Sequence, residues 1–149
     1  MFKVEILKTA NREVLSQINS LTAKLSLSTI PPKPLDLEIL KKLLSQKSFY
    51  ILVVRDKNII VGLLNLYFTQ ITTGFIGELE DLIVAEPYRK WGLAIALIKE
   101  AVDIAEKMGA KHISARVNPK RIEANKVYPA MGFLKMETNF YRINLPRKK

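Results

Sequence analysis

The chain has 149 residues, no cysteine and a formal net charge of +10 at pH 7. Without cysteine it can form no disulfide, thiolate metal site or cysteine nucleophile, and no apolar run is long enough to cross a membrane. Hydrophobic residues make up 48% and charged residues 26% of the chain, a balance typical of one globular domain over residues 1–149. The start shows no signal-peptide pattern, so we expect a soluble, cytoplasmic protein.

The first half of the sequence predicts a short edge strand, two helices and a β-hairpin. In the first helix, apolar residues recur at helical spacing at Val14, Ile18, Leu21 and Leu25. The two hairpin strands are apolar and rich in β-branched residues, and a polar turn at 56–58 joins them. The predicted ranges are 2–7 for the edge strand, 11–25 and 36–47 for the helices, and 49–55 and 59–68 for the hairpin.

The second half alternates strands and helices. A long helix over 90–108 carries an apolar stripe on one face, and Gly109 follows it as a cap. The other predicted ranges are strands at 75–84, 112–117, 133–136 and 140–145 and a helix at 121–130. A helix between two strands favours a parallel pair, so we expect an α/β domain whose central twisted sheet is mixed and carries helices on both faces.

The most informative motif lies at residues 89–94, after an apolar strand and at the start of the long helix. The first turn of a helix has unpaired N–H groups and the positive end of the helix dipole, and both attract phosphate. Gly92 lets the main chain approach a ligand closely. The motif therefore predicts a nucleotide-like cofactor that carries phosphate. A Walker loop and a full dinucleotide fingerprint are both missing.

These residues resemble the cofactor signature of the GNAT superfamily of N-acetyltransferases. The signature reads Arg or Gln, two residues, Gly, one residue, and Gly or Ala; here Arg89, Gly92 and Ala94 occupy its positions. Residues 80–88 resemble the family's fourth strand, and the block from Asn118 to Phe133 resembles its last conserved block. The resemblance is strong over 75–136 and implies a three-layer fold with six to seven strands and about four helices.

The resemblance implies transfer of an acetyl group from acetyl-CoA to a primary amine. Both substrates would be bound together, with direct attack, no covalent enzyme intermediate and no metal. The acceptor stays open between a protein N-terminus or lysine and a small-molecule amine, and its loops are expected near 26–36, 69–74 and 137–139. A homodimer also stays open. The alternatives are a non-catalytic domain that binds coenzyme A and, from the net charge, a nucleic-acid-binding module.

The resemblance further implies how the co-substrate is held. Main-chain N–H groups from Lys90 to Ala94 would receive the pyrophosphate, and the main chain of 82–84 would bind pantetheine in a gap opened by a bulge. Asn118 is also read as a turn residue before Pro119. The implied cofactor-binding residues are Leu82, Ile83, Val84, Arg89, Lys90, Trp91, Gly92, Leu93, Ala94, Asn118 and Asn125.

Two side chains are implied as catalytic. Glu80 is the expected general base for the acceptor amine, with Glu78 and Asp81 as competitors. Strand alternation puts Glu78 and Glu80 on one face and Asp81 on the other, although a bulge would reset that register. Tyr128 is the expected general acid for the leaving thiolate. Pro129 follows it and disfavours the helical conformation there.

Overall fold

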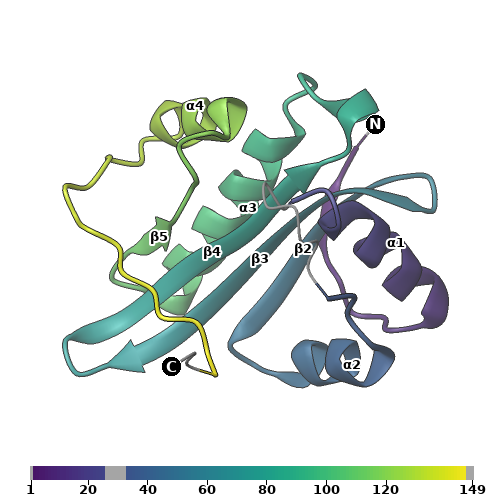
Figure 1. Ribbon diagram of the computed structural model, residues 1–149, viewed down its shortest axis with the longest axis horizontal. Helices are drawn as coiled ribbons and strands as arrows, with labels where there is room; N and C mark the ends of the chain where they lie inside the picture. The colour runs from purple at the N-terminus through teal and green to yellow at the C-terminus, as the bar shows by residue number, and fades with distance from the viewer. Residues whose placement is uncertain (1, 26–32, 147–149) are drawn as a thin grey trace.

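The computed structural model describes residues 2–25 and 33–146. In this part of the chain, five strands form one sheet in the order β1-β2-β3-β4-β5, with helices on both faces (Figure 1). The pairs from β1 to β4 are antiparallel and β4–β5 is parallel, which confirms the predicted mixed sheet. The strands are β1 Val4–Ile6, β2 Phe49–Asp56, β3 Ile59–Ile71, β4 Gly74–Val84 and β5 Ile113–Ala115, and the helices are α1 Arg12–Thr22, α2 Leu37–Ser45, α3 Leu93–Met108 and α4 Ile122–Ala130.

Each face of the sheet has its own apolar core. On one face, α1 and α2 bury Ile18 and Leu40 against Ile51 and Leu63. On the other, α3 and α4 cover a cluster that includes the fully buried Leu97. This division follows from strand alternation, because successive side chains of a buried strand point to opposite faces. Among the described residues, no helix is both long and apolar enough to span a membrane.

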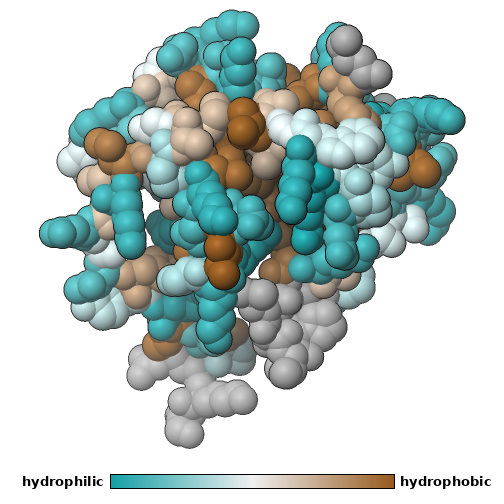
Figure 2. Space-filling view, turned by 90° about the horizontal axis from the view of Figure 1, so that it is seen from above, coloured by the Kyte–Doolittle hydropathy of each residue, from teal (hydrophilic) through white to brown (hydrophobic). Residues whose placement is uncertain are grey.

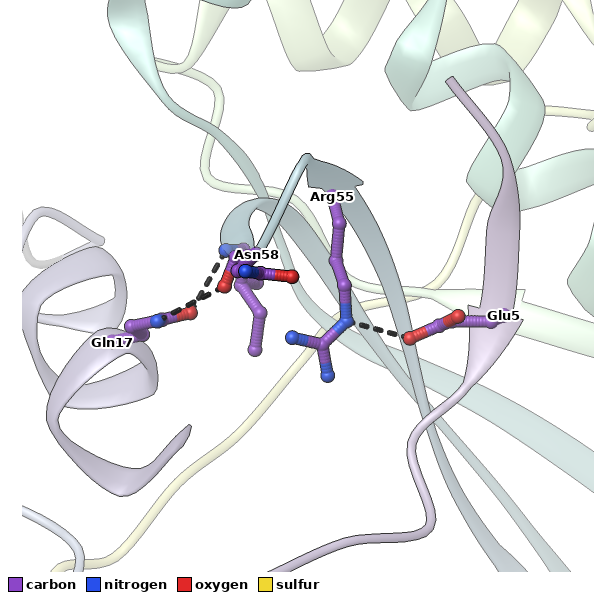
Figure 3. Close-up of polar contacts among 5 residues, drawn as sticks. Glu5, Gln17, Arg55 and Asn58 are labelled. Atoms are coloured by element: carbon purple, nitrogen blue, oxygen red, sulfur yellow. Dashed lines mark hydrogen bonds and ion pairs between the residues drawn. The ribbon is translucent and has the colours of Figure 1, made fainter. Parts of the chain in front are cut away.

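Polar contacts fix α1 and β1 against the central hairpin (Figure 3). The Gln17 side chain donates to the carbonyl of Asn58 at 3.2 Å and accepts from the N–H of Ile60 at 2.9 Å. Arg55 on β2 donates to Glu5 on β1 at 2.6 Å. The hairpin turn is thereby joined to α1, and the edge strand β1 is joined to the hairpin.

The sheet divides halfway along β4. The pairing of β3 with β4 shifts between Leu63 and Asn65, and Asp81 has a left-handed φ of 60°, which marks a β-bulge. Beyond that point no described strand pairs with the other side of β4, because β5 pairs with Gly77–Leu79 only. The residues of β4 from Glu80 onward are therefore separated from β5, and a gap opens between the two strands.

Gly77 lies at the closed end of this division. A Cβ added there would meet a side-chain carbon of Ile113 at 2.7 Å and of Phe68 at 3.0 Å. We expect Gly77→Ala to destabilise the protein by about 1–3 kcal/mol through overpacking. Thermal unfolding should show a midpoint lower by roughly 2–4 °C per kcal/mol. Adding Ile113→Ala should recover part of that loss; a purely additive double variant would contradict the proposed crowding.

The two predicted C-terminal strands, 133–136 and 140–145, are wrong. In the described chain, residues after α4 form no strand, so the sheet has five strands where six to seven were expected. The apolar side chains of this segment are largely exposed, Leu134 at 83% and Tyr141 at 85%. Strand propensity largely reflects the packing of side chains against a sheet, and this segment has no buried face that supplies such packing.

The expected acceptor loops also differ from the structure. Residues 69–71 and 74 belong to β3 and β4, so the predicted loop at 69–74 is a tight turn at 72–73. The expected loop at 26–36 lies partly outside the described residues, which resume at Lys33. Residues 137–139 belong to no helix or strand.

Candidate active site

The first turn of α3 leaves main-chain N–H groups without helical partners. Gly92 is the N-cap residue with φ 77°, and no side chain in the described part of the chain caps the helix. The first helical hydrogen bond runs from the N–H of Ala96 to the carbonyl of Gly92, so the N–H groups just before Ala96 have no partner within the helix. Lys90 is also left-handed, with φ 67°. Alternating backbone conformations of this kind turn successive N–H groups to one side, which is how main-chain anion nests form.

Side chains hold this turn in place from two directions. Arg89 donates through Nε to the carbonyl of Val84 at 3.1 Å, which connects the turn to the end of β4. Trp91 is 61% exposed and lies against Phe2 and Tyr88, with ring centroids 5.4 and 5.9 Å away. Figure 2 shows this end of the molecule, where hydrophilic side chains surround apolar patches nearer the middle. Residues 89–94 therefore form a supported, accessible turn.

A cleft lies where β4 separates from β5, between β4 and the start of α4. The carbonyl of Leu82 accepts from Nη2 of Arg121 at 3.1 Å, and that of Val84 accepts from Arg89. The carbonyl of Leu82 thus faces Arg121 at the start of α4, while Ile83 and Val84 are paired with Leu63 and Gly62 of β3. The cleft is lined by Leu79, Glu80, Asp81, Leu82, Arg116, Val117, Arg121, Ala124 and Tyr128.

Glu80 lies beside Glu78 and Arg116 at this cleft. Nη1 of Arg116 is 3.6 Å from Oε1 of Glu80 and 3.7 Å from Oε2 of Glu78. Burial, followed by the negative charge of Asp81, raises the pKa of Glu80 above its ordinary value, and the Arg116 guanidinium opposes that shift. A carboxylate with a raised pKa accepts a proton more readily near neutral pH, which suits a general base.

Asp81 lies on the same face as Glu80, contrary to simple alternation. Asn65 is paired with Glu80 across β3 and β4, and its Nδ2 donates to Oδ2 of Asp81 at 3.0 Å. The bulge explains the difference, because one extra residue on β4 resets the side-chain register. Two adjacent carboxylates thus point to the face that carries α1 and α2.

Tyr128 lies across the same cleft on α4. It is 9% exposed, and its ring meets Phe133 edge-on at 5.3 Å. Burial raises the pKa of Tyr128 to about 12, so its hydroxyl stays protonated at working pH. The expected disruption by Pro129 is wrong, since α4 continues to Ala130. Pro129 is one residue from the end of the helix, so its missing N–H removes few main-chain hydrogen bonds. The N–H of Met131 still donates to the carbonyl of Val127.

The two predicted asparagines hold the loop that follows β5. Oδ1 of Asn118 accepts from the N–H of Lys120 at 2.9 Å, as in an Asx turn. Nδ2 of Asn125 donates to the carbonyls of Asn118 and Arg121, both at 2.9 Å. Their described hydrogen bonds therefore orient the start of α4 and, with it, Tyr128.

Three residues near the reacting groups were not among the predicted site residues: Asn65, Arg116 and Arg121. Arg116 had a usable signal, because a cation just after β5 lies beside the acidic residues of its parallel neighbour β4. Arg121 was part of the resembling block but was given no role. Asn65 could not be found without the pairing register of β3 and β4, which the bulge alters.

Solved structures with a similar fold support this description. A ribosomal-protein-alanine N-acetyltransferase from Brucella melitensis biovar Abortus 2308 aligns with a TM-score of 0.82 and 19% identity over 99% of both chains. An aminoglycoside acetyltransferase from an uncultured soil metagenomic sample aligns with a TM-score of 0.82 and 22% identity over 96% of each. AAC(6')-Iy, solved with a bisubstrate analog of coenzyme A, aligns with a TM-score of 0.77 and 17% identity over 97% of this chain and 99% of that one.

At these identities the likeness shows the fold alone. No curated protein matches the chain. The family model described as acetyltransferase (GNAT) family matches residues 15–133, which is most of the chain and includes the turn before α3, the β4–β5 cleft and Tyr128. The chain therefore belongs to the acetyltransferase (GNAT) family, the N-acetyltransferase enzymes that use acetyl-CoA.

Proposed function

We propose that residues 1–149 form one acetyltransferase domain that moves an acetyl group from acetyl-CoA to a primary amine by direct attack. One observation carries this: Glu80 and Tyr128 line one cleft beside β4, and Arg89 of the open turn before α3 bonds the carbonyl of Val84 at the end of the same strand. A Cβ built on Gly92 meets nothing within 4 Å, so the turn leaves room for a diphosphate. Unpaired N–H groups, nearby cationic side chains and open space fit that group.

The side chains at the cleft divide the proton transfers between them. Glu80 accepts a proton from the acceptor ammonium, and the freed amine attacks the thioester carbonyl. A main-chain N–H of Leu82 or Val84 stabilises the developing oxyanion. When the carbon–sulfur bond breaks, the Tyr128 hydroxyl donates its proton to the departing thiolate, and the nitrogen loses its second proton to solvent as the amide forms. Tyr128 then takes a proton from solvent and Glu80 returns its proton to solvent. The products are an N-acetyl amine, coenzyme A with a free thiol, and one released proton.

The test begins with thermal unfolding in the presence of acetyl-CoA. Ligand at about 100 times its dissociation constant adds roughly 2.7 kcal/mol to the unfolding free energy. For a domain of this size the midpoint should rise by roughly 5–10 °C. Release of free thiol in the presence of amines then measures turnover. Cofactor binding with no turnover across a wide amine panel would favour the non-catalytic alternative; no midpoint rise at millimolar acetyl-CoA would remove the proposal.

The pH dependence of turnover separates Glu80 from its neighbours. The ionised carboxylate is the base, so the rate should fall as pH drops through the raised pKa of Glu80. Arg116→Gln removes a charge that lowers this pKa, so the acid limb of the pH–rate profile should move to higher pH. Glu80→Gln should lower kcat by about 100-fold or more and abolish that limb. An unchanged profile in Arg116→Gln would assign the limb to another group.

A further inference from the structure

A second cavity lies on the opposite side of β4 from α3, between the sheet and the helices α1 and α2. Its volume is about 420 Å³, within the range of small-molecule sites. Its apolar wall is formed by Ile18, Leu25, Leu35, Leu43, Ile51 and Leu63. The cavity is therefore suited to an apolar body rather than to a sugar or a polar chain.

Most polar groups in this cavity are already hydrogen-bonded within the protein. Asn19 bonds the main chain of Leu35 in both directions, at 2.9 and 2.8 Å. The hydroxyl of Thr22 donates to the carbonyl of Ile18 at 2.9 Å. Among the described lining residues, two are charged: Lys33 on the helix side and Asp81 on the sheet side. A ligand thus meets an apolar wall with a carboxylate at the sheet.

Asp81 lines both this cavity and the β4–β5 cleft. Its left-handed backbone at the bulge places the side chain at the junction, and Asn65 holds one carboxylate oxygen at 3.0 Å. A strained non-glycine residue at a site is commonly retained for its positioning role. Asp81 is therefore the charged residue that this cavity shares with the cleft of Glu80.

We propose that the apolar wall of this cavity selects the acceptor and that Asp81 binds the acceptor ammonium before Glu80 deprotonates it. The acceptor class is a primary amine on an apolar body, with no carboxylate on the neighbouring carbon and no further cationic groups. A neighbouring carboxylate would face Asp81 at close range, and further cations would meet Lys33 and the net charge of +10. The proposal rests on the proposed function and specifies its substrate.

Thiol-release assays at saturating acetyl-CoA test this class with matched acceptors. Isoamylamine and a peptide beginning with leucine both carry a primary amine on an apolar body. The first is a free amine and the second is a peptide N-terminus, so their comparison distinguishes these two kinds of acceptor. Free leucine adds the carboxylate, ethanolamine removes the apolar body, and spermidine adds cations. We expect kcat/KM for isoamylamine or the leucine peptide to exceed that of the other three by at least about tenfold, the factor that one charge contact of 1.4 kcal/mol supplies.

Asp81→Asn then tests the contact itself. Asparagine tolerates the left-handed backbone as aspartate does, so the bulge should be kept while the charge is lost. We expect KM for isoamylamine to rise at least about tenfold with a much smaller change in kcat, and the discrimination against free leucine to shrink. Asp103→Asn, which removes an exposed carboxylate on α3, is the matched control and should change neither.

The outcomes separate this proposal from the proposed function. Acetylation with an unchanged KM in Asp81→Asn, or equal use of isoamylamine and free leucine, overturns the acceptor proposal and leaves acetyl transfer standing. If acetyl-CoA neither raises the unfolding midpoint nor releases thiol with any acceptor, the proposed function fails and the acceptor proposal fails with it.

Discussion

Gly92→Asp is expected to weaken acetyl-CoA binding roughly 30- to 150-fold, which corresponds to about 2–3 kcal/mol of like-charge repulsion against the diphosphate. Aspartate is one of the few side chains tolerated at a left-handed φ such as the 77° of Gly92, so the turn should still form. Its carboxylate would occupy the open space where the unpaired N–H groups of α3 converge. Isothermal titration with acetyl-CoA measures the change.

Two further variants separate charge from shape and from backbone strain. Gly92→Asn has nearly the same shape without the charge, so it should lose much less affinity than Gly92→Asp. Gly109 caps the other end of α3 with φ 76° and also has nothing within 4 Å of an added Cβ. Gly109→Asp makes a similar backbone demand at the far end and should leave affinity unchanged. Equal losses at both ends of α3 would show that the effect is structural.

Tyr128→Phe is expected to lower kcat by about 100-fold or more, because general acid catalysis contributes roughly 10²- to 10⁴-fold. The substitution keeps the buried ring and its edge-on contact with Phe133 and removes only the hydroxyl. The affinity for acetyl-CoA should therefore stay close to that of the native protein. Because the pKa of Tyr128 is raised to about 12, no alkaline loss of activity from its ionisation should appear below pH 10.

The control for this variant is Tyr141→Phe, which removes a hydroxyl from a largely exposed ring. It should leave kcat unchanged. If Tyr128→Phe also retains full kcat, the departing thiolate takes its proton from water or from another group at the cleft. If Tyr128→Phe lowers affinity and kcat together with the unfolding midpoint, its role is structural, and the proposed acid is wrong.

Local signals in the sequence were enough to predict most of the fold. The apolar residues at helical spacing in the first predicted helix predict α1. The strand–turn–helix at 89–94 predicts the open turn before α3, and the helix between β4 and β5 predicts their parallel pairing. These features depend on neighbouring residues and on chain connectivity, so a single sequence contains them.

Features that depend on pairing between distant segments were not predictable. The left-handed conformation of Asp81 follows from the bulge against β3, and a lone sequence gives no register for that bulge. The segment after α4 has alternating apolar residues. In the structure it contacts the rest of the domain through side chains: the guanidinium carbon of Arg116, for example, lies 5.0 Å from the ring centroid of Phe140. Its β-like pattern therefore predicted strands that the structure does not form.

A crystal structure of the protein with acetyl-CoA tests the central claim most directly. We predict diphosphate oxygens within hydrogen-bond distance of the main-chain N–H groups between Lys90 and Ala94, and the acetyl carbonyl between the two halves of the cleft, near Leu82 and Tyr128. A co-substrate bound elsewhere, with the turn before α3 making no contact to phosphate, would contradict the account.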